Sequence, residues 1–113
     1  MVTNPISREE FIHALLRAYC TTPGTTGSIR RQDRLLAAQL YERGVPLIAV
    51  DNALLLVVAR RLFRPAGAPP LPSIRSLAYF LPVIDEVLHL QISQDYFQHL
   101  RNQITRFRTR HSP

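Results

Sequence analysis

The fold is decided by PLIAVDNALLLVVARRLF, Pro46 to Phe63, whose centre from Ala53 to Ala59 carries no polar side chain. Gly44 stops this segment on one side and Pro65 on the other, and 18 residues between two such stops are typical of a helix rather than a strand. The helix would span about 27 Å. Because it is apolar on every side, other segments must cover it. The sequence therefore predicts an all-α fold, a compact single-domain bundle of about five helices around a buried central helix, 46–63.

The apolar run of this helix is expected to be buried in protein and not in a membrane. It is far shorter than the roughly 20 residues that a bilayer requires. Leu55, in the middle of the run, is expected to be enclosed on all sides by the other helices. Cys20 is the only cysteine, and no apolar export segment is found near Met1, so we expect no disulfide framework and a cytoplasmic location. We expect 1–113 to form one helical domain.

A first helix is predicted from a start signal near the N-terminus. Ser7 and Glu10 have the spacing of a capping box, in which each side chain bonds the backbone N–H of the other residue. The helix is expected to end near Cys20. The following segment 21–28, TTPGTTGS, contains no apolar residue, and we expect it to be a mobile loop.

A second helix, 30–43, is predicted to lead directly into the central one. Gly44 follows its last apolar position and can adopt the left-handed conformation that caps a helix. Pro46 then suits the first turn of the central helix, where its missing N–H costs nothing. The apolar side of the second helix is expected to carry Leu35, Leu36, Leu40 and Tyr41, with Ala37 and Ala38 allowing close approach.

Prolines dominate the segment after the central helix. The stretch 64–72, RPAGAPPLP, contains four of them and is expected to lie extended as a stiff strap. Ser73 is expected to cap the next helix. Pro82 lies inside this predicted helix, where it removes one backbone hydrogen bond, so we expect a kink or a break between Phe80 and Pro82.

The last helix is predicted to be the most amphipathic and most basic in the chain. Ser93 repeats the capping signal, and a narrow apolar stripe runs from Gln94 to about Arg108. Residues 109–113 are expected to form a basic tail. The stripe consists of Phe97, Leu100, Ile104 and Phe107.

The sequence offers no combination of side chains suited to catalysis or to metal binding. Its four histidines lie on different segments without a second ligand at metal-binding spacing. Asp85 and Glu86 are adjacent, so on a helix they would point about 100° apart and could not share a proton. Cys20 has no nearby base, and Asp51 is expected to pair with a neighbouring arginine. We therefore expect no enzyme, no cofactor and no metal.

The charge of the chain favours a polyanionic partner. Its 14 basic residues are all arginine and outnumber 8 acidic residues, for a net charge of +6. GC-rich codon usage and phosphate recognition both favour arginine over lysine, and the sequence leaves both explanations open. The excess of positive charge suits DNA. The candidate DNA-binding residues are Arg101, Arg106, Arg108 and Arg110 at the C-terminal end, with Arg30, Arg31 and Arg34 on the second helix.

Two alternatives to phosphate binding by these arginines remain open. Leu40 to Ala59 has the outline of a helix-turn-helix, but its second helix would present leucine and valine to the bases where a polar face is required. The chain could instead be a protein-interaction or oligomerisation module whose arginines form ion pairs between subunits. Nucleic acid that copurifies with the protein would favour DNA binding over this second alternative.

A resemblance to a known family points in the same direction. From about Leu35 to Val87 the chain has a helix that ends in glycine, an apolar helix with alanines, a loop, and a helix that opens on an aromatic residue. Tyr79, Val83 and Val87 have the spacing of a Tyr-x-x-x-Ile-x-x-x-Trp pattern, with Val87 in place of tryptophan. These features resemble the C-terminal domain of DnaD-like primosome accessory proteins. The resemblance implies a non-enzymatic helical domain that binds DNA and proteins in replication or mobile-element propagation, with Tyr79 as a DNA-binding residue. The alternative is that the three residues form the core stripe of a buried helix.

Overall fold

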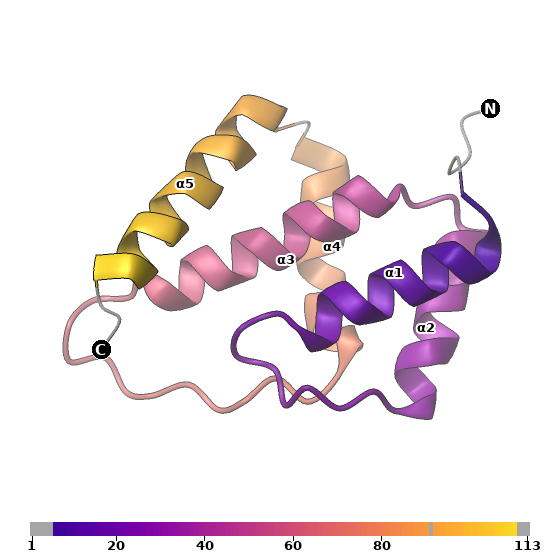
Figure 1. The fold of residues 1–113 in the computed structure, drawn as a ribbon, viewed down its shortest axis with the longest axis horizontal. Coiled ribbons are helices and arrows are strands. Elements are labelled where there is room, and N and C mark those ends of the chain that lie inside the picture. The colour runs from indigo at the N-terminus through magenta and orange to yellow at the C-terminus, as the bar shows by residue number, and fades with distance from the viewer. Residues whose placement is uncertain (1–5, 91, 111–113) are drawn as a thin grey trace.

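The protein is an all-α bundle, as the sequence predicts. The computed structural model describes residues 6–90 and 92–110, and of Arg110 only the backbone. The basic tail predicted for 109–113 falls mostly outside these residues. The helices are α1 (Arg8–Cys20), α2 (Arg31–Glu42), α3 (Leu47–Leu62), the short 3₁₀ helix η1 (Leu77–Phe80), α4 (Leu81–Leu90) and α5 (Gln94–Arg110) (Figure 1).

Helix α3 occupies the centre of the bundle and confirms the main prediction. It packs against α1, α4, α5 and η1 (Figure 1). One part of the prediction is wrong, because α3 is not enclosed on every side. Ile48 is half exposed and Leu55 is only partly buried, since none of the described helices completely covers the side of α3 between α1 and α5. The buried residues of α3 are Ala49, Val50, Asn52, Ala53, Leu54, Leu56, Val57, Val58 and Ala59.

Helices α1 and α2 lie side by side, and their boundaries are confirmed. Ser7 and Glu10 form the predicted capping box at the start of α1. At the end of α2, Gly44 has φ +74°. The N–H of Val45 donates to the carbonyl of Leu40 over 3.1 Å, as in a Schellman cap. This cap turns the chain directly into α3.

The predicted apolar side of α2 needs a correction. Leu35 is 54% exposed, whereas Ala37 and Leu40 are buried. Helix α2 lies against α1 and η1 with the side that carries Asp33, and this carboxylate is 1% exposed. The packed side of α2 therefore contains a buried carboxylate, whereas the sequence pattern predicted only apolar contacts there.

The helix predicted to begin at Ser73 begins only at Leu77. Ile74 lies extended beside the 21–30 loop (Figure 1), because its N–H donates to the carbonyl of Gly24 and its carbonyl accepts from Thr26, over 2.7 and 3.0 Å. These long-range bonds outweigh the local capping signal. They also attach the loop to this segment by backbone hydrogen bonds. The mobility predicted for residues 21–28 stays a prediction.

The break predicted near Pro82 is confirmed. The 3₁₀ turn of η1 ends at Phe80, and α4 begins at Leu81. Pro82 therefore lies in the first turn of α4. The N–H groups of a first turn have no acceptor within the helix, so proline loses no helical hydrogen bond there. Its ring would have clashed with the preceding turn of a continuous helix.

Helix α5 packs on α3 through the predicted stripe. Ser93 caps its start by accepting a hydrogen bond from the Tyr96 N–H over 3.2 Å. Of the stripe, Phe97, Leu100 and Ile104 are buried. Among residues 6–90 and 92–110, no helix combines the length and the apolar character needed to cross a membrane.

Candidate nucleic-acid interface

Three of the eight acidic side chains form exposed ion pairs with arginines among the described residues. Glu42 pairs with Arg8 over 3.0 Å, and Glu86 pairs with Arg60. Asp85 lies 3.6 Å from a guanidinium nitrogen of Arg43. The bond from Arg60 lowers the pKa of the Glu86 carboxyl. These exposed pairs contribute little stability, but they neutralise three carboxylates and leave other arginines without acidic partners.

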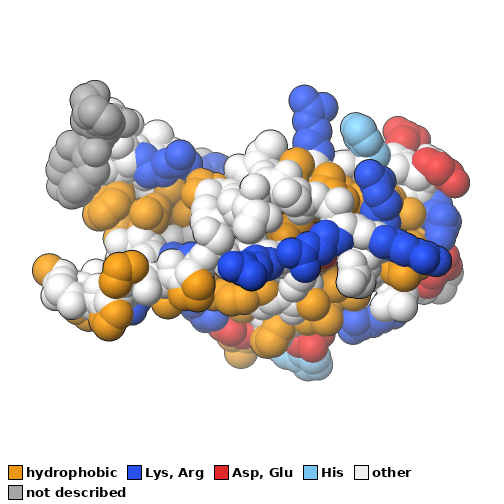
Figure 2. Space-filling view, turned by 90° about the horizontal axis from the view of Figure 1, so that it is seen from below, with side chains coloured by type: hydrophobic (Ala, Val, Ile, Leu, Met, Phe, Trp, Pro, Cys, Tyr) orange, Lys and Arg blue, Asp and Glu red, His pale blue; other side chains and the backbone are white. Residues whose placement is uncertain are grey.

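Five such arginines follow the seam between the 21–30 loop and the strap. We call them the basic band; they are Arg30, Arg31, Arg61, Arg64 and Arg75. None of them makes an ion pair with a carboxylate within the described part of the chain. Figure 2 shows a row of blue side chains across the middle of this face, with the red acidic side chains toward its edges.

Asp33 joins the segments that carry Arg30 and Arg75, at one end of the basic band. Its carboxylate accepts a hydrogen bond from the Arg30 N–H over 2.8 Å and another from the Leu77 N–H over 2.9 Å. The start of α2 therefore lies against the segment that carries Arg75. The sequence reasoning missed Arg75, because this contact joins residues 44 positions apart.

Backbone carbonyls hold the other end of the band. The Arg61 guanidinium donates to the carbonyl of Pro72 over 2.8 Å, and Arg64 donates to that of Pro69 over 2.7 Å. A Cβ atom at Gly24 would lie 3.2 Å from the Arg61 side chain, so the glycine leaves room for it. Carbonyl partners fix the two guanidinium groups without neutralising their charge.

Tyr79 borders a cavity of about 410 Å³ beside the band, together with Arg61, Arg64 and Val83. Its side chain is 48% exposed, and its hydroxyl accepts a hydrogen bond from Arg61 over 3.4 Å. Val87 is buried in the core. The three residues of the family pattern thus do not form one core stripe, because Tyr79 belongs to η1 and Val87 to α4. An exposed aromatic ring and guanidinium groups border one cavity.

The arginines of α5 do not form one cluster. Arg101 and Arg108 line a groove of about 290 Å³ between α3, α5 and the end of α1. Arg106 lies on another side of α5, because five helical positions correspond to about 140° of rotation from Arg101. The side chain of Arg110 lies outside the described residues.

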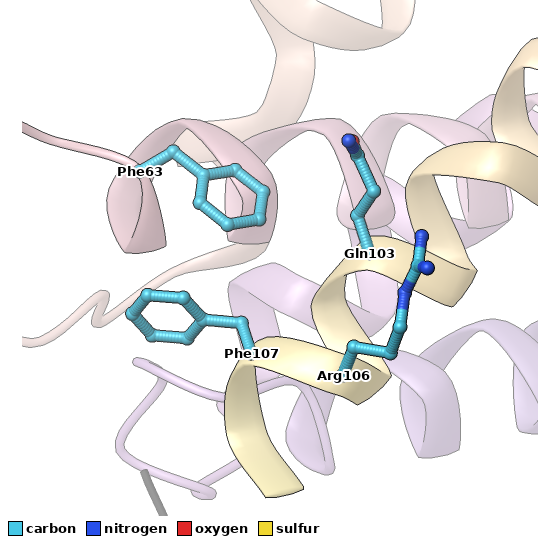
Figure 3. A pocket seen from close by; sticks show the side chains of 4 residues that line it. All are labelled: Phe63, Gln103, Arg106 and Phe107. Atoms are coloured by element: carbon cyan, nitrogen blue, oxygen red, sulfur yellow. The ribbon is translucent and has the colours of Figure 1, made fainter. Parts of the chain in front are cut away.

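Figure 3 shows the surroundings of Arg106. The rings of Phe63 and Phe107 meet edge to face with their centres 5.4 Å apart, and the Arg106 side chain extends away from them. This ring pair fastens the end of α5 to the end of α3. Arg34, the remaining candidate of α2, lines a cavity against α1 and lies one helical turn after Arg30 and Arg31.

Asp51 faces the groove that Arg101 and Arg108 line. The ion pair expected for it is not found among the described residues. Burial raises the pKa of the Asp51 carboxyl, and the positive charge of Arg101 partly offsets this effect. The folded protein therefore holds the charged carboxylate less favourably than the unfolded chain does.

We expect Asp51→Asn to raise the melting temperature at pH 7. A folded-state pKa above the unfolded value weakens the folded state once the carboxyl is ionised, so the gain should vanish as the pH falls below about 4. Melting curves of both proteins from pH 3 to 8 would measure this. Arg101→Gln should act in the opposite direction at pH 7, and only while Asp51 is present. A gain that persisted unchanged at pH 3 would contradict the electrostatic explanation.

In residues 6–90 and 92–110, no three His, Cys, Asp or Glu side chains are grouped as ligands of a metal ion would be. No protein-family model matches the chain, and neither a curated protein nor a solved structure matches it. The DnaD-like resemblance therefore rests on the residues quoted for it and stays a prediction.

Proposed function

We propose that this protein is a non-enzymatic module that binds DNA through its phosphates along the basic band. The observation that supports the proposal is the separation of charge on its surface. Three carboxylates are neutralised by Arg8, Arg43 and Arg60, while no guanidinium group of the band forms an ion pair in the described chain; the Asp33 carboxylate beside the band accepts from backbone N–H groups instead. A guanidinium group that is not paired with a carboxylate can bind phosphate oxygens.

The shape of the band suits a polymer better than a single small anion. Its arginines come from the start of α2, the end of α3 and the segment before η1, and only Arg61 and Arg64 of the five line the cavity beside Tyr79. Contacts of this kind position a nucleic-acid backbone without reading its sequence. Tyr79 adds an exposed ring on which a base of a single strand can stack. We therefore favour sequence-tolerant binding.

The test compares two triple variants that remove the same charge from different faces. The band variant carries Arg30→Gln, Arg31→Gln and Arg75→Gln; the matched control carries Arg101→Gln, Arg106→Gln and Arg108→Gln. All six side chains are exposed, so both variants should keep the helical circular dichroism of the parent.

The measured quantity is the affinity of each protein for a labelled DNA oligonucleotide, determined by fluorescence anisotropy between 50 and 200 mM salt. The affinity of the parent should fall by about 10²-fold over this range, because each phosphate contact adds nearly one unit to the salt dependence. The slope of log affinity against log salt should decrease by about two to three units in the band variant and by much less in the control. Single-stranded and duplex oligonucleotides would be compared in parallel.

Two outcomes would overturn the proposal in different ways. If only the α5 control lost affinity, the interface would lie on α5, where the sequence first placed it. If the parent bound no DNA at 50 mM salt and copurified with no nucleic acid, a protein-interaction function would replace DNA binding.

A further inference from the structure

A second cavity, of about 450 Å³, lies between α1 and the start of α2, and none of the five arginines of the basic band lines it. Its floor is apolar and consists of Ile12, Leu16 and Ile29. Its volume lies within the range of small-molecule sites, which combine an apolar lining with a few polar groups. The polar groups here are Arg17, Arg34, His13 and Glu9.

The two arginines lie at the same end of the cavity. Arg8 near the start of α1 pairs with Glu42 at the end of α2, and farther along both helices Arg17 and Arg34 line the same cavity. Arg34, near the start of α2, therefore lies beside the second half of α1, which carries Arg17. Glu9 lies eight positions before Arg17, about 12 Å along the helix axis. The positive end is thus separated from the acidic side chain.

Neither the Arg17 nor the Arg34 guanidinium group forms an ion pair with a carboxylate within residues 6–90 and 92–110. Arginine forks bind a planar carboxylate in bidentate fashion, and the mostly apolar lining has room for a hydrocarbon body but not for a second charge. We propose that this cavity binds a small amphipathic carboxylate. Its hydrocarbon tail lies on Ile12, Leu16 and Ile29, and its carboxylate lies between Arg17 and Arg34. The proposal does not rest on DNA binding, because neither arginine belongs to the basic band.

Cys20 provides a reporter for this site. It is the only cysteine of the chain, it is partly exposed, and it lines the cavity. A bound molecule should therefore shield its thiol from a neutral reagent such as iodoacetamide. The probe is decanoate, kept below its micelle concentration, and the measured quantity is the labelling rate of Cys20 at increasing decanoate.

We expect decanoate to slow the labelling in a saturable manner. Decanol has the same chain length without the charge and should need at least about tenfold more to reach the same protection, the factor that corresponds to 1.4 kcal/mol. A variant with Arg17→Gln and Arg34→Gln, with its labelling normalised to its own rate without ligand because nearby cations favour the reactive thiolate, should need about tenfold more decanoate for half-maximal protection. The matched control, with Arg101→Gln and Arg106→Gln, should keep the parental midpoint.

Three results would overturn the proposal. Equal midpoints for decanoate and decanol would mean that the arginines do not select an anion. An unchanged midpoint in the Arg17 and Arg34 variant would place the carboxylate elsewhere. Calorimetric binding of decanoate with no change in Cys20 labelling, or no binding at all, would show that this cavity does not hold it.

Discussion

Asp33→Ala is expected to lower the free energy of unfolding by about 3–5 kcal/mol. The carboxylate is almost fully buried and accepts two backbone hydrogen bonds, from Arg30 and from Leu77. A hydrogen bond to a charged group contributes about 1.5–3 kcal/mol, and its loss leaves a buried N–H without a partner. Urea denaturation followed by circular dichroism would measure the change.

Asp95→Ala is the matched control for this prediction. Asp95 also lies in the first turn of a helix, but its side chain is exposed and no described hydrogen bond is attributed to it. Its removal should cost no more than about 1 kcal/mol, the usual size of a helix-dipole contribution. If both variants lost similar stability, Asp33 would act only as a local capping residue. Asp33→Ala should also weaken DNA binding, because Asp33 positions the backbone beside Arg30 and Arg75.

Asp33 illustrates which parts of the structure the sequence could predict. Helix boundaries set by nearby residues were predicted correctly, because the partners of Ser7 and of Gly44 lie within a few positions. Asp33 has the same local pattern as any acidic residue in a first helical turn. Its second partner, the Leu77 N–H, is far away in the sequence, and no local pattern indicates it.

The same limit explains the errors made around the strap. Ser73 has a valid capping pattern, but backbone bonds between Ile74 and the distant Gly24 keep this segment extended. The pairing of loop and strap also brings Arg61 and Arg75 to one face. Neither residue stood out in the sequence, where both lie far from the arginine-rich stretches of α2 and α5. Their one visible signal was the presence of arginine on both sides of the proline-rich segment.

The site on α5 was predicted from arginines that lie off its apolar stripe, and lying off the stripe does not place them on one side of the helix. Arg101, Arg106 and Arg108 were grouped in this way, although helical geometry turns Arg106 to another side. The fold adds that Arg101 faces Asp51, which reduces the net charge of that groove. Tertiary structure therefore moves our proposal from α5 to the basic band.

Adjacent leucines of the central helix should respond very differently to truncation. Leu56 is 6% exposed within the core, so Leu56→Ala should lower the free energy of unfolding by about 2–5 kcal/mol through lost burial and a cavity. Leu55 borders the open groove next to Asp51 and is only partly buried. Because it has less apolar surface to lose and its site opens to solvent, Leu55→Ala should cost only about 1 kcal/mol.

Urea denaturation of the two variants under identical conditions would test this difference, since both remove the same atoms from neighbouring positions of one helix. An unchanged denaturant dependence would show that the unfolded states are comparable. Equal losses would mean that the groove beside Leu55 is closed in solution and that α3 is enclosed, as its sequence alone suggests. A small loss at Leu55 with a large loss at Leu56 would instead confirm that one side of the central helix stays open between α1 and α5.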